Sequence, residues 1–89
     1  MPFHITRFEA TPNPNALKCW LDRSISDGPR SFLTAEMAAG DSIASSLFAI
    51  GLTSVYFNGS WITINKPAGA DWAAIKQRLA ATLAAMEPP

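Results

Sequence analysis

The chain contains a single histidine, His4, so any catalytic arrangement built on an imidazole depends on that residue. His4 lies near the start of the chain among strand-like residues, and no serine sits in the Gly-x-Ser-x-Gly turn of a nucleophile elbow. The acidic residues are dispersed and indicate no acid–base pair. The glycines stand singly, without a phosphate-cradling pattern. We therefore expect a protein that is not an enzyme, in which His4 is a surface residue of a strand.

Residues 11–18, Thr-Pro-Asn-Pro-Asn-Ala-Leu-Lys, are the stretch that packing patterns explain least. Pro12 and Pro14 fix their own φ at about −65° and disfavour helical backbone in the residue before each. This predicts a stiff, extended corner between two strands. Asn13 and Asn15 can bond nearby backbone groups or reach outward. Two interpretations stand, a well-ordered turn or a recognition loop. The contact residues of such a loop would be Thr11, Pro12, Asn13, Pro14 and Asn15.

Alternating apolar residues predict strands on both sides of this corner, at Phe3–Glu9 and Ala16–Leu21. In the second strand Leu17, Cys19 and Leu21 share the expected core face. The other face of that strand carries Ala16, Lys18 and Trp20. The first strand alternates imperfectly, so its buried face stays open between the two choices. The next residues, 23–30, are polar and include an Asp-Gly-Pro turn sequence, which predicts a surface excursion.

Capping residues and apolar spacing predict the helices. Residues 31–34 are a candidate short edge strand, and Thr34 would cap a helical turn through Ala39. Asp41 then caps a helix that carries Ile43, Leu47 and Ile50, and Gly51 follows at the place of a left-handed C-cap. Asp71 caps a final helix, whose apolar residues are Trp72, Ile75, Leu79, Leu83 and Met86 and which ends at Pro88-Pro89.

An Asn-Gly pair at 58–59 joins the apolar segments 53–57 and 61–65 and is a strong hairpin signal, because a type I′ turn needs positive φ at both central residues. In that register the pairs are Val55 with Ile62, Thr53 with Ile64 and Tyr56 with Trp61. A slip of one residue would move Trp61 to the opposite face. Two hairpins, each followed by helix, predict an α+β fold with two layers. Its order is ββαββα, an antiparallel four-stranded sheet with two helices on one face.

The length and charge of the chain limit its function. Its 89 residues predict one domain over 1–89 with a single modest core. Seven acidic and seven basic residues cancel, and the basic residues form no cluster, so we expect no nucleic-acid partner. No signal-peptide pattern and no apolar run of about 20 residues appears, which predicts a soluble, cytoplasmic protein without membrane contact.

Several segments, in this order, carry a family resemblance: Thr-Pro-Asn-Pro-Asn-x-Leu-Lys at 11–18, Ala-Ser-Ser-Leu-Phe-Ala-Ile-Gly-Leu at 44–52, Val-Tyr-Phe at 55–57, Trp-Ile-Thr-Ile at 61–64 and Asp-Trp at 71–72. The chain resembles the N-terminal domain of the Nfu (NifU-like) family of iron–sulfur cluster scaffold proteins, over nearly its whole length. The turn Asn58-Gly59-Ser60 departs from that family, which has Gly at the first, Pro or another residue at the second and Asp at the third turn position, so the resemblance does not fix the register of this hairpin. The resemblance implies a domain that stops where the family's C-terminal Cys-x-x-Cys domain would begin.

Cys19 is the only cysteine, so the chain forms no internal disulfide. Iron–sulfur cluster ligation generally takes four thiolates, which a single chain of this sequence cannot supply. The position of Cys19 on the expected core face favours a small buried hydrophobe. The alternative is a metal-ligand or redox role, with a dimer bringing two thiols together. We expect no cofactor and no metal site.

Two functions from different classes follow. The resemblance implies a stand-alone domain that assists iron–sulfur cluster assembly or delivery by binding assembly proteins or apo-clients, without itself holding a cluster. Its expected contact surface is the loop 11–15, and the aromatic residues Tyr56 and Trp61 are candidates to extend it. The alternative is a small interaction domain unrelated to clusters, which uses its half-covered sheet face to bind a peptide or to form a weak homodimer.

Overall fold

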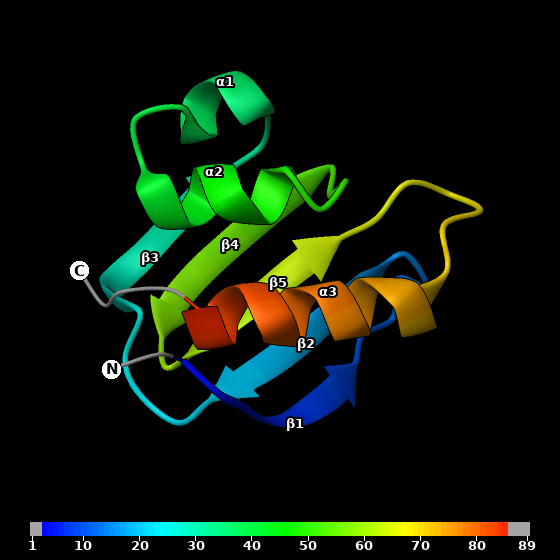
Figure 1. Cartoon of the computed structure of the whole chain (residues 1–89), viewed down its shortest axis with the longest axis horizontal. Helices are drawn as coiled ribbons and strands as arrows, with labels where there is room; N and C mark the ends of the chain where they lie inside the picture. Colours follow the sequence, from blue (N-terminus) through cyan, green and yellow to red (C-terminus); the bar gives the residue numbers. More distant parts are fainter. Residues whose placement is uncertain (1–2, 86–89) are drawn as a thin grey trace.

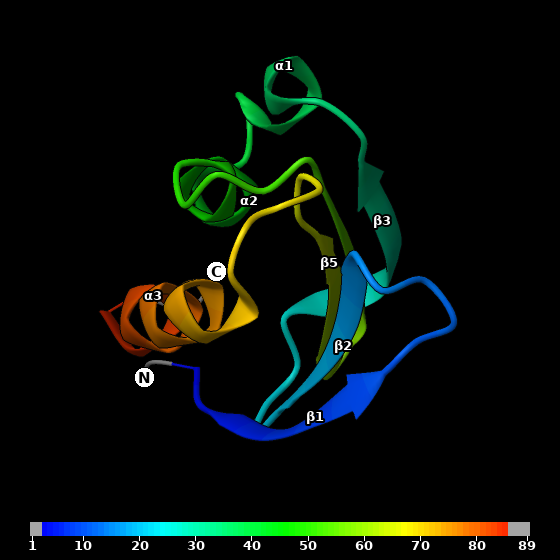
Figure 2. The ribbon, with the colours of Figure 1, turned by 90° about the vertical axis from the view of Figure 1, so that its right-hand side faces the viewer.

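The computed structural model describes residues 3–85 and consists of two layers, an antiparallel sheet and a set of helices on one of its faces. Figure 1 and Figure 2 show α2 and α3 side by side over this face, while α1 lies beyond α2. No helix in the described part of the chain combines the length and the apolar character needed to cross a bilayer. In chain order the elements are β1 (Ile5–Ala10), β2 (Ala16–Leu21), β3 (Ser26–Phe32), α1 (Ala35–Ala38), α2 (Ser42–Phe48), β4 (Ser54–Gly59), β5 (Trp61–Asn65) and α3 (Trp72–Ala85).

The sheet has five strands in the order β1-β2-β5-β4-β3, with every neighbouring pair antiparallel. The α+β class and the helical layer agree with the sequence prediction, but the expected count of four strands is wrong. The fifth strand, β3, is an edge strand that joins residues 26–30 of the predicted surface excursion to residues 31 and 32 of the candidate edge strand. Its register shifts between Ser26 and Arg30, so three residues, 27–29, lie opposite the single residue Asn58. An edge strand tolerates this bulge and Pro29, because one of its sides needs no partner.

The hairpin of β4 and β5 turns one residue later than predicted. Asn58 pairs with Trp61 and Phe57 with Ile62, so the two loop residues are Gly59 and Ser60. Only Gly59 has a positive φ, of 60°, which fits a turn with glycine at its first central position rather than a type I′ turn. Every predicted pair therefore shifts by two residues along its strand. Because two is the side-chain period of a strand, the predicted faces are nevertheless kept.

The helix caps follow the sequence prediction. Asp41 Oδ1 accepts hydrogen bonds from the backbone N–H groups of Ile43 (3.0 Å) and Ala44 (2.9 Å) at the start of α2. Gly51 has a φ of 109° just after this helix, as a left-handed cap requires. Asp71 Oδ1 accepts from Ala73 N–H at the start of α3, and Thr34 Oγ1 accepts from Met37 N–H at α1. The predicted helix residue Met86 and the terminating Pro88-Pro89 lie outside the described residues.

The core lies between the sheet and the helices. In β2 the residues Leu17, Cys19 and Leu21 are buried, as predicted, and pack with α3 residues such as Leu79. The first strand, β1, alternates imperfectly because the register of its pairing with β2 shifts between Ile5 and Arg7. Because of this bulge, Ile5 and the more exposed Phe8 both lie opposite core-face residues of β2.

Candidate interaction surfaces

The loop from Thr11 to Asn15 is held by its own side chains. The Thr11 hydroxyl lies 2.9 Å from the Asn13 carbonyl oxygen and 3.1 Å from that of Ala16. It also accepts a hydrogen bond from Asn13 N–H, and Asn13 Oδ1 accepts one from Asn15 N–H at 2.9 Å. This is an Asx-type turn between two prolines. The loop is therefore preset in shape before any partner arrives.

A second set of bonds fixes the loop to the connection between β5 and α3. Lys66 donates to Asn15 twice, from its backbone N–H to the carbonyl oxygen (2.8 Å) and from Nζ to Oδ1 (3.0 Å). Trp72 Nε1 donates to the carbonyl oxygen of Pro14 at 3.0 Å. The side chain of Asn15 thus serves the fold. The residues of the loop that stay exposed are Pro12, Asn13 and Pro14.

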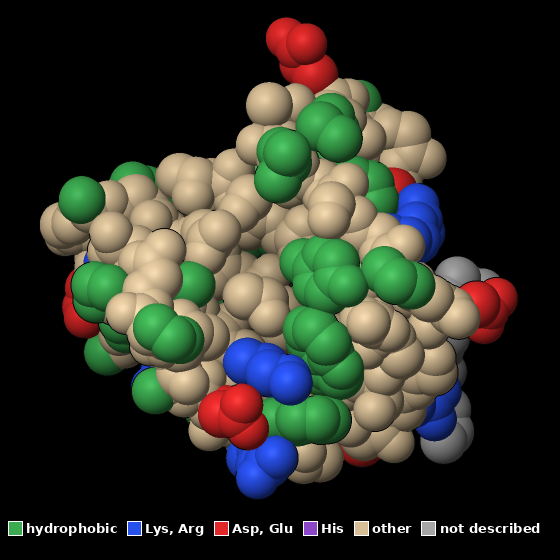
Figure 3. All heavy atoms as spheres, turned by 180° about the vertical axis from the view of Figure 1, so that it is seen from behind, with side chains coloured by type: hydrophobic (Ala, Val, Ile, Leu, Met, Phe, Trp, Pro, Cys, Tyr) green, Lys and Arg blue, Asp and Glu red, His purple; other side chains and the backbone are tan. Residues whose placement is uncertain are grey.

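A second surface lies on the uncovered face of the sheet. The Trp61 ring lies 5.4 Å from Tyr56 and 6.3 Å from Trp20, measured between centroids. Lys18 and Arg7 stand beside these rings, and Trp20 Nε1 donates to Glu9 Oε1 at 3.4 Å. We call this cluster the aromatic face; its residues are Arg7, Glu9, Lys18, Trp20, Tyr56 and Trp61. Figure 3 shows hydrophobic side chains gathered there next to basic and acidic ones.

The two surfaces lie toward opposite ends of the central strands. Ala16, next to the loop, pairs with Asn65, whereas Trp20 pairs with Trp61 four residues farther along. At about 3.3 Å per residue this separates them by about 13 Å. Lys18 and Glu9 lie between the loop and the paired tryptophans. That Tyr56 and Trp61 extend the contact surface of the loop stays a prediction. Sequence reasoning did not assign Trp20 to a site, although its place on the face of β2 opposite Cys19 was the available signal.

Cys19 lies in the core, whereas His4 lies on the surface. Cys19 is fully buried, with 0% of its surface exposed, and this burial raises the pKa of its thiol to about 12. His4 is exposed and bonded to Asp22, which accepts from the His4 backbone N–H (2.9 Å) and lies 3.3 Å from Nδ1. The backbone hydrogen bond from His4 lowers the pKa of Asp22. Across residues 3–85 no three His, Cys, Asp or Glu side chains gather as a metal site would require.

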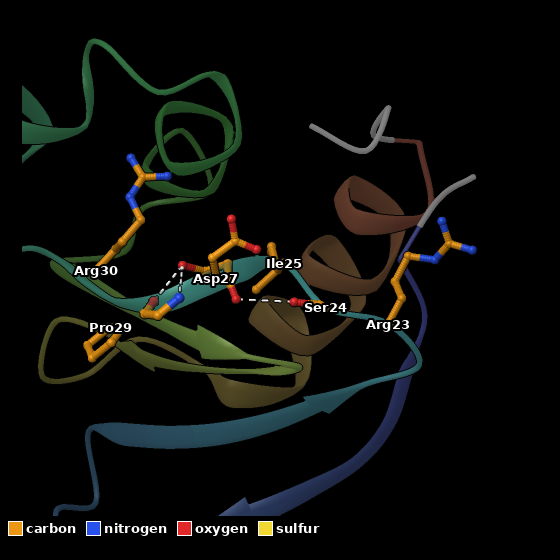
Figure 4. Close-up of a pocket in the computed structure, with 8 residues that line it drawn as sticks. Arg23, Ser24, Ile25, Asp27, Pro29 and Arg30 are labelled. Carbon is orange, nitrogen blue, oxygen red and sulfur yellow. Dashed lines mark hydrogen bonds between the residues drawn. The ribbon is translucent and has the colours of Figure 1, made fainter.

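A hollow of about 510 Å³ lies along residues 23–30, in β3 and the segment before it. Figure 4 shows Arg23 and Arg30 at the two ends of this stretch. The Arg30 guanidinium forms an ion pair with Asp41 at 2.8 Å, and the Ser26 hydroxyl bonds the backbone of Gly28. Because the lining comes from one continuous segment, the hollow brings no distant residues together and carries no catalytic arrangement.

Comparisons with solved structures show which known fold the chain shares. The chain superposes on a NifU-like protein of Saccharomyces cerevisiae with a TM-score of 0.78 at 23% identity, covering 93% of this chain and 76% of that one. It superposes on the protein SAV1430 of Staphylococcus aureus with a TM-score of 0.74 at 18% identity, covering 89% and 96%. The fold is thus that of the NifU-like α+β domains.

The comparisons of sequence give the family. The family described as scaffold protein Nfu/NifU N terminal matches residues 5–87, and the chain belongs to this family. A NifU-like protein of Schizosaccharomyces pombe is 36% identical over 74 residues, and the mitochondrial NFU1 iron–sulfur cluster scaffold homolog of Drosophila ananassae is 33% identical over 76 residues. These matches cover 79% and 82% of this chain but only 28% and 27% of the relatives.

The buried thiol predicts a pH effect on stability. Unfolding exposes Cys19, which then ionises near its ordinary pKa of 9.0, while the folded thiol stays protonated up to about 12. Because the folded pKa is the higher one, the stabilisation is complete below about pH 9 and is lost between about pH 9 and pH 12. At about pH 10 the loss is about 1.4 kcal/mol, one pKa unit.

Urea unfolding of the native chain and of Cys19→Ala, each at about pH 8 and about pH 10, measures this effect. The native chain should lose about 1.4 kcal/mol more than the variant over this interval. The difference between the two proteins removes the contributions of the other titrating groups. Equal losses would contradict the assignment of the effect to Cys19.

Proposed function

We propose that this chain assists iron–sulfur cluster assembly or delivery through protein–protein contacts and does not itself hold a cluster. The observation that carries the proposal is the burial of Cys19. A cluster ligand must be a thiolate within reach of the metal, whereas this thiol is enclosed by the core and strongly disfavours ionisation. Membership of the Nfu/NifU N-terminal family supports the connection with iron–sulfur clusters.

The loop from Thr11 to Asn15 is the contact surface that we propose for this role. Its internal hydrogen bonds and its bond to Trp72 hold the loop in one shape. Binding a partner would therefore cost little conformational entropy in the loop. Pro12, Asn13 and Pro14 are exposed at its tip. The proposed partners are assembly proteins that carry a Cys-x-x-Cys cluster site, or apo-clients of the pathway. A cytoplasmic location stays a prediction, since the relative from Drosophila ananassae is named as mitochondrial.

The first test asks whether the chain holds a cluster. The purified protein is incubated anaerobically with ferrous iron and sulfide, desalted and examined by visible absorption. We expect a colourless protein, and the same result for Cys19→Ser. Visible absorbance that is present in the native chain and lost in Cys19→Ser would overturn the proposal in favour of ligation by Cys19.

The second test asks whether the loop binds a cluster-assembly protein. The probe is a cluster-loaded NifU-type Cys-x-x-Cys domain, and its affinity for the chain is measured by calorimetry. Pro12→Ala combined with Asn13→Asp changes the exposed tip but keeps the Oδ1 acceptor that Asn15 N–H requires. We expect affinity to fall at least about fivefold, within the range of an interface contact residue. Pro29→Ala, at an exposed proline on the distant edge strand, is the matched control and should bind as the native chain does.

The aromatic face favours a second candidate function, a self-associating or peptide-binding domain independent of clusters. Trp20, Tyr56 and Trp61 are half-buried on the uncovered sheet face, and aromatic residues are enriched at protein-binding surfaces. Sedimentation of the native chain and of Trp61→Ser at low concentration tests self-association. A dimer that dissociates in the variant supports it, and a monomer in both cases removes it.

A further inference from the structure

Lys18 occupies an unusual position at the centre of the aromatic face. Its Nζ atom lies 4.3 Å from the ring centroid of Trp20 and 4.1 Å from that of Trp61. Both distances lie well within the range of a cation–π interaction, which is about 6 Å. The two indoles belong to paired residues of adjacent strands, so the sheet fixes both rings next to the ammonium group. Lys18 is therefore held in place, with its side chain half-buried.

The ammonium group of Lys18 has no anionic partner among residues 3–85. Ion pairs among these residues join His4 to Asp22, Arg7 to Glu9, and Arg30 to Asp41, and none of the three involves Lys18. Glu9 is the carboxylate of the aromatic face, and it bonds Arg7 and the indole N–H of Trp20. The face thus carries two cations and one anion that is already engaged. An ammonium group has three donors, and those of Lys18 are available to an acceptor that comes from outside.

We propose that the aromatic face binds an acidic, extended segment of a partner protein. A carboxylate of the segment would bond Lys18 Nζ, and an apolar side chain beside it would pack on Tyr56 and Trp61. The inference rests on the proposed function in that it names the chemistry of the protein partner, but its test needs no cluster protein.

Two other occupants fit the face less well. A second copy related by a two-fold axis would place an identical face against this one, so two faces that each carry an excess positive charge from Lys18 would repel each other. A nucleic acid needs several cations along its phosphate backbone, whereas Arg7 is already paired with Glu9 and only Lys18 is left. Charge complementarity therefore favours a carboxylate-bearing peptide.

The three tryptophans of the chain make this test specific. The indole N–H signals of Trp20 and Trp61 report on the aromatic face in two-dimensional NMR, while Trp72 is bonded to Pro14 and serves as an internal reference. The probe is a capped peptide of sequence Ser-Glu-Leu-Glu-Leu-Glu-Ser, and its control replaces each Glu with Gln. We expect the acidic peptide to shift the Trp20 and Trp61 signals, to leave Trp72 unmoved, and to bind more weakly as salt rises.

Variants of two lysines assign the effect. Lys18→Gln should weaken binding about fivefold, the value of a partly exposed ion pair. Lys76→Gln is the matched control, because Lys76 Nζ also lies over a ring, 4.8 Å from Phe8, but on the helix-covered side. It should bind as the native chain does. The same spectra report whether each variant is folded, and Lys18→Arg, which keeps the charge, should retain most of the binding.

Three results would refute the inference: equal binding of the Gln peptide, indole shifts that follow protein concentration alone, and tighter binding of polyuridine than of the acidic peptide. The second would assign the face to a second copy and the third to nucleic acid. Failure here is separable from failure of the proposed function. Should the acidic peptide leave Trp20 and Trp61 unmoved while the chain still binds the cluster-loaded scaffold domain, the inference alone is lost.

Discussion

Phe57→Ala should destabilise the protein by about 3–5 kcal/mol, the range for removing a fully buried phenylalanine. Phe57 is 1% exposed and lies in the middle of the sheet, on the face covered by helices. The centroid of its ring lies 5.5 Å from that of Phe32, and the two ring planes make an angle of 57°. This contact joins the edge strand β3 to the core. Small domains have stabilities at or near the low end of about 5–15 kcal/mol, so this single change should bring the chain close to unfolding at room temperature.

Urea unfolding followed by circular dichroism measures the loss. Leu33→Ala is the control, because it also deletes an apolar side chain but at a position that is 65% exposed. It should change stability by less than about 0.5 kcal/mol. A Phe57→Ala protein that is nearly as stable as the native chain would mean that Phe57 does not occupy the core described here.

Asp41→Ala should cost about 2 kcal/mol. Asp41 caps α2 by accepting two backbone hydrogen bonds, and loss of such a cap costs about 0.5–2 kcal/mol. Its second oxygen forms the 2.8 Å ion pair with Arg30, which holds β3 against the helical layer. Because the Arg30 side chain is 50% exposed, solvent screens this pair and it adds less than about 1 kcal/mol.

Two further variants separate the cap from the ion pair. Asp41→Asn keeps an oxygen at the cap and loses the charge. It should therefore cost less than half of the stability that Asp41→Ala costs. Arg30→Gln leaves the cap intact and should cost less than about 1 kcal/mol. Thermal unfolding of all three proteins gives the comparison. An Asn variant as unstable as the Ala variant would show that the charge, and not the cap, supplies the stability.

Local signals in the sequence predicted much of this fold. Asp41 and Asp71 cap helices by accepting hydrogen bonds from N–H groups two or three residues farther along the chain. Such a contact is local, so it can be predicted without knowing which distant residues pack nearby. Gly51 ends a helix for a similarly local reason. The core face of β2 followed from alternation alone. The motif at 11–18 predicted the family, which the match over residues 5–87 confirms.

The errors fell where distant pairing outweighs local preference. The Asn-Gly pair at 58–59 is a good turn by itself, yet the register of β4 places the turn at Gly59-Ser60, where Val55 and Phe57 meet Ile64 and Ile62 across the strands. Residues 26–30 of β3 were predicted as part of a surface excursion because their sequence is polar, and only residues 31 and 32 fell in the candidate edge strand. The whole segment 26–32 becomes a strand since β4 offers it an open edge, a condition that the segment does not contain.

The sequence by itself determined the family, the α+β class, the helices with their caps and the burial of Cys19, because each depends on residues close together in the chain or on a period within one element. The sequence also named the loop 11–15 and the residues Tyr56 and Trp61 as candidates, but tertiary structure alone decided which other residues meet them. Lys18, Trp20, Tyr56 and Trp61 meet because β2, β4 and β5 pair in one register, and Pro14 meets Trp72 across a gap of 58 residues. Such contacts are fixed by strand order and register, which arise from the packing of the whole core.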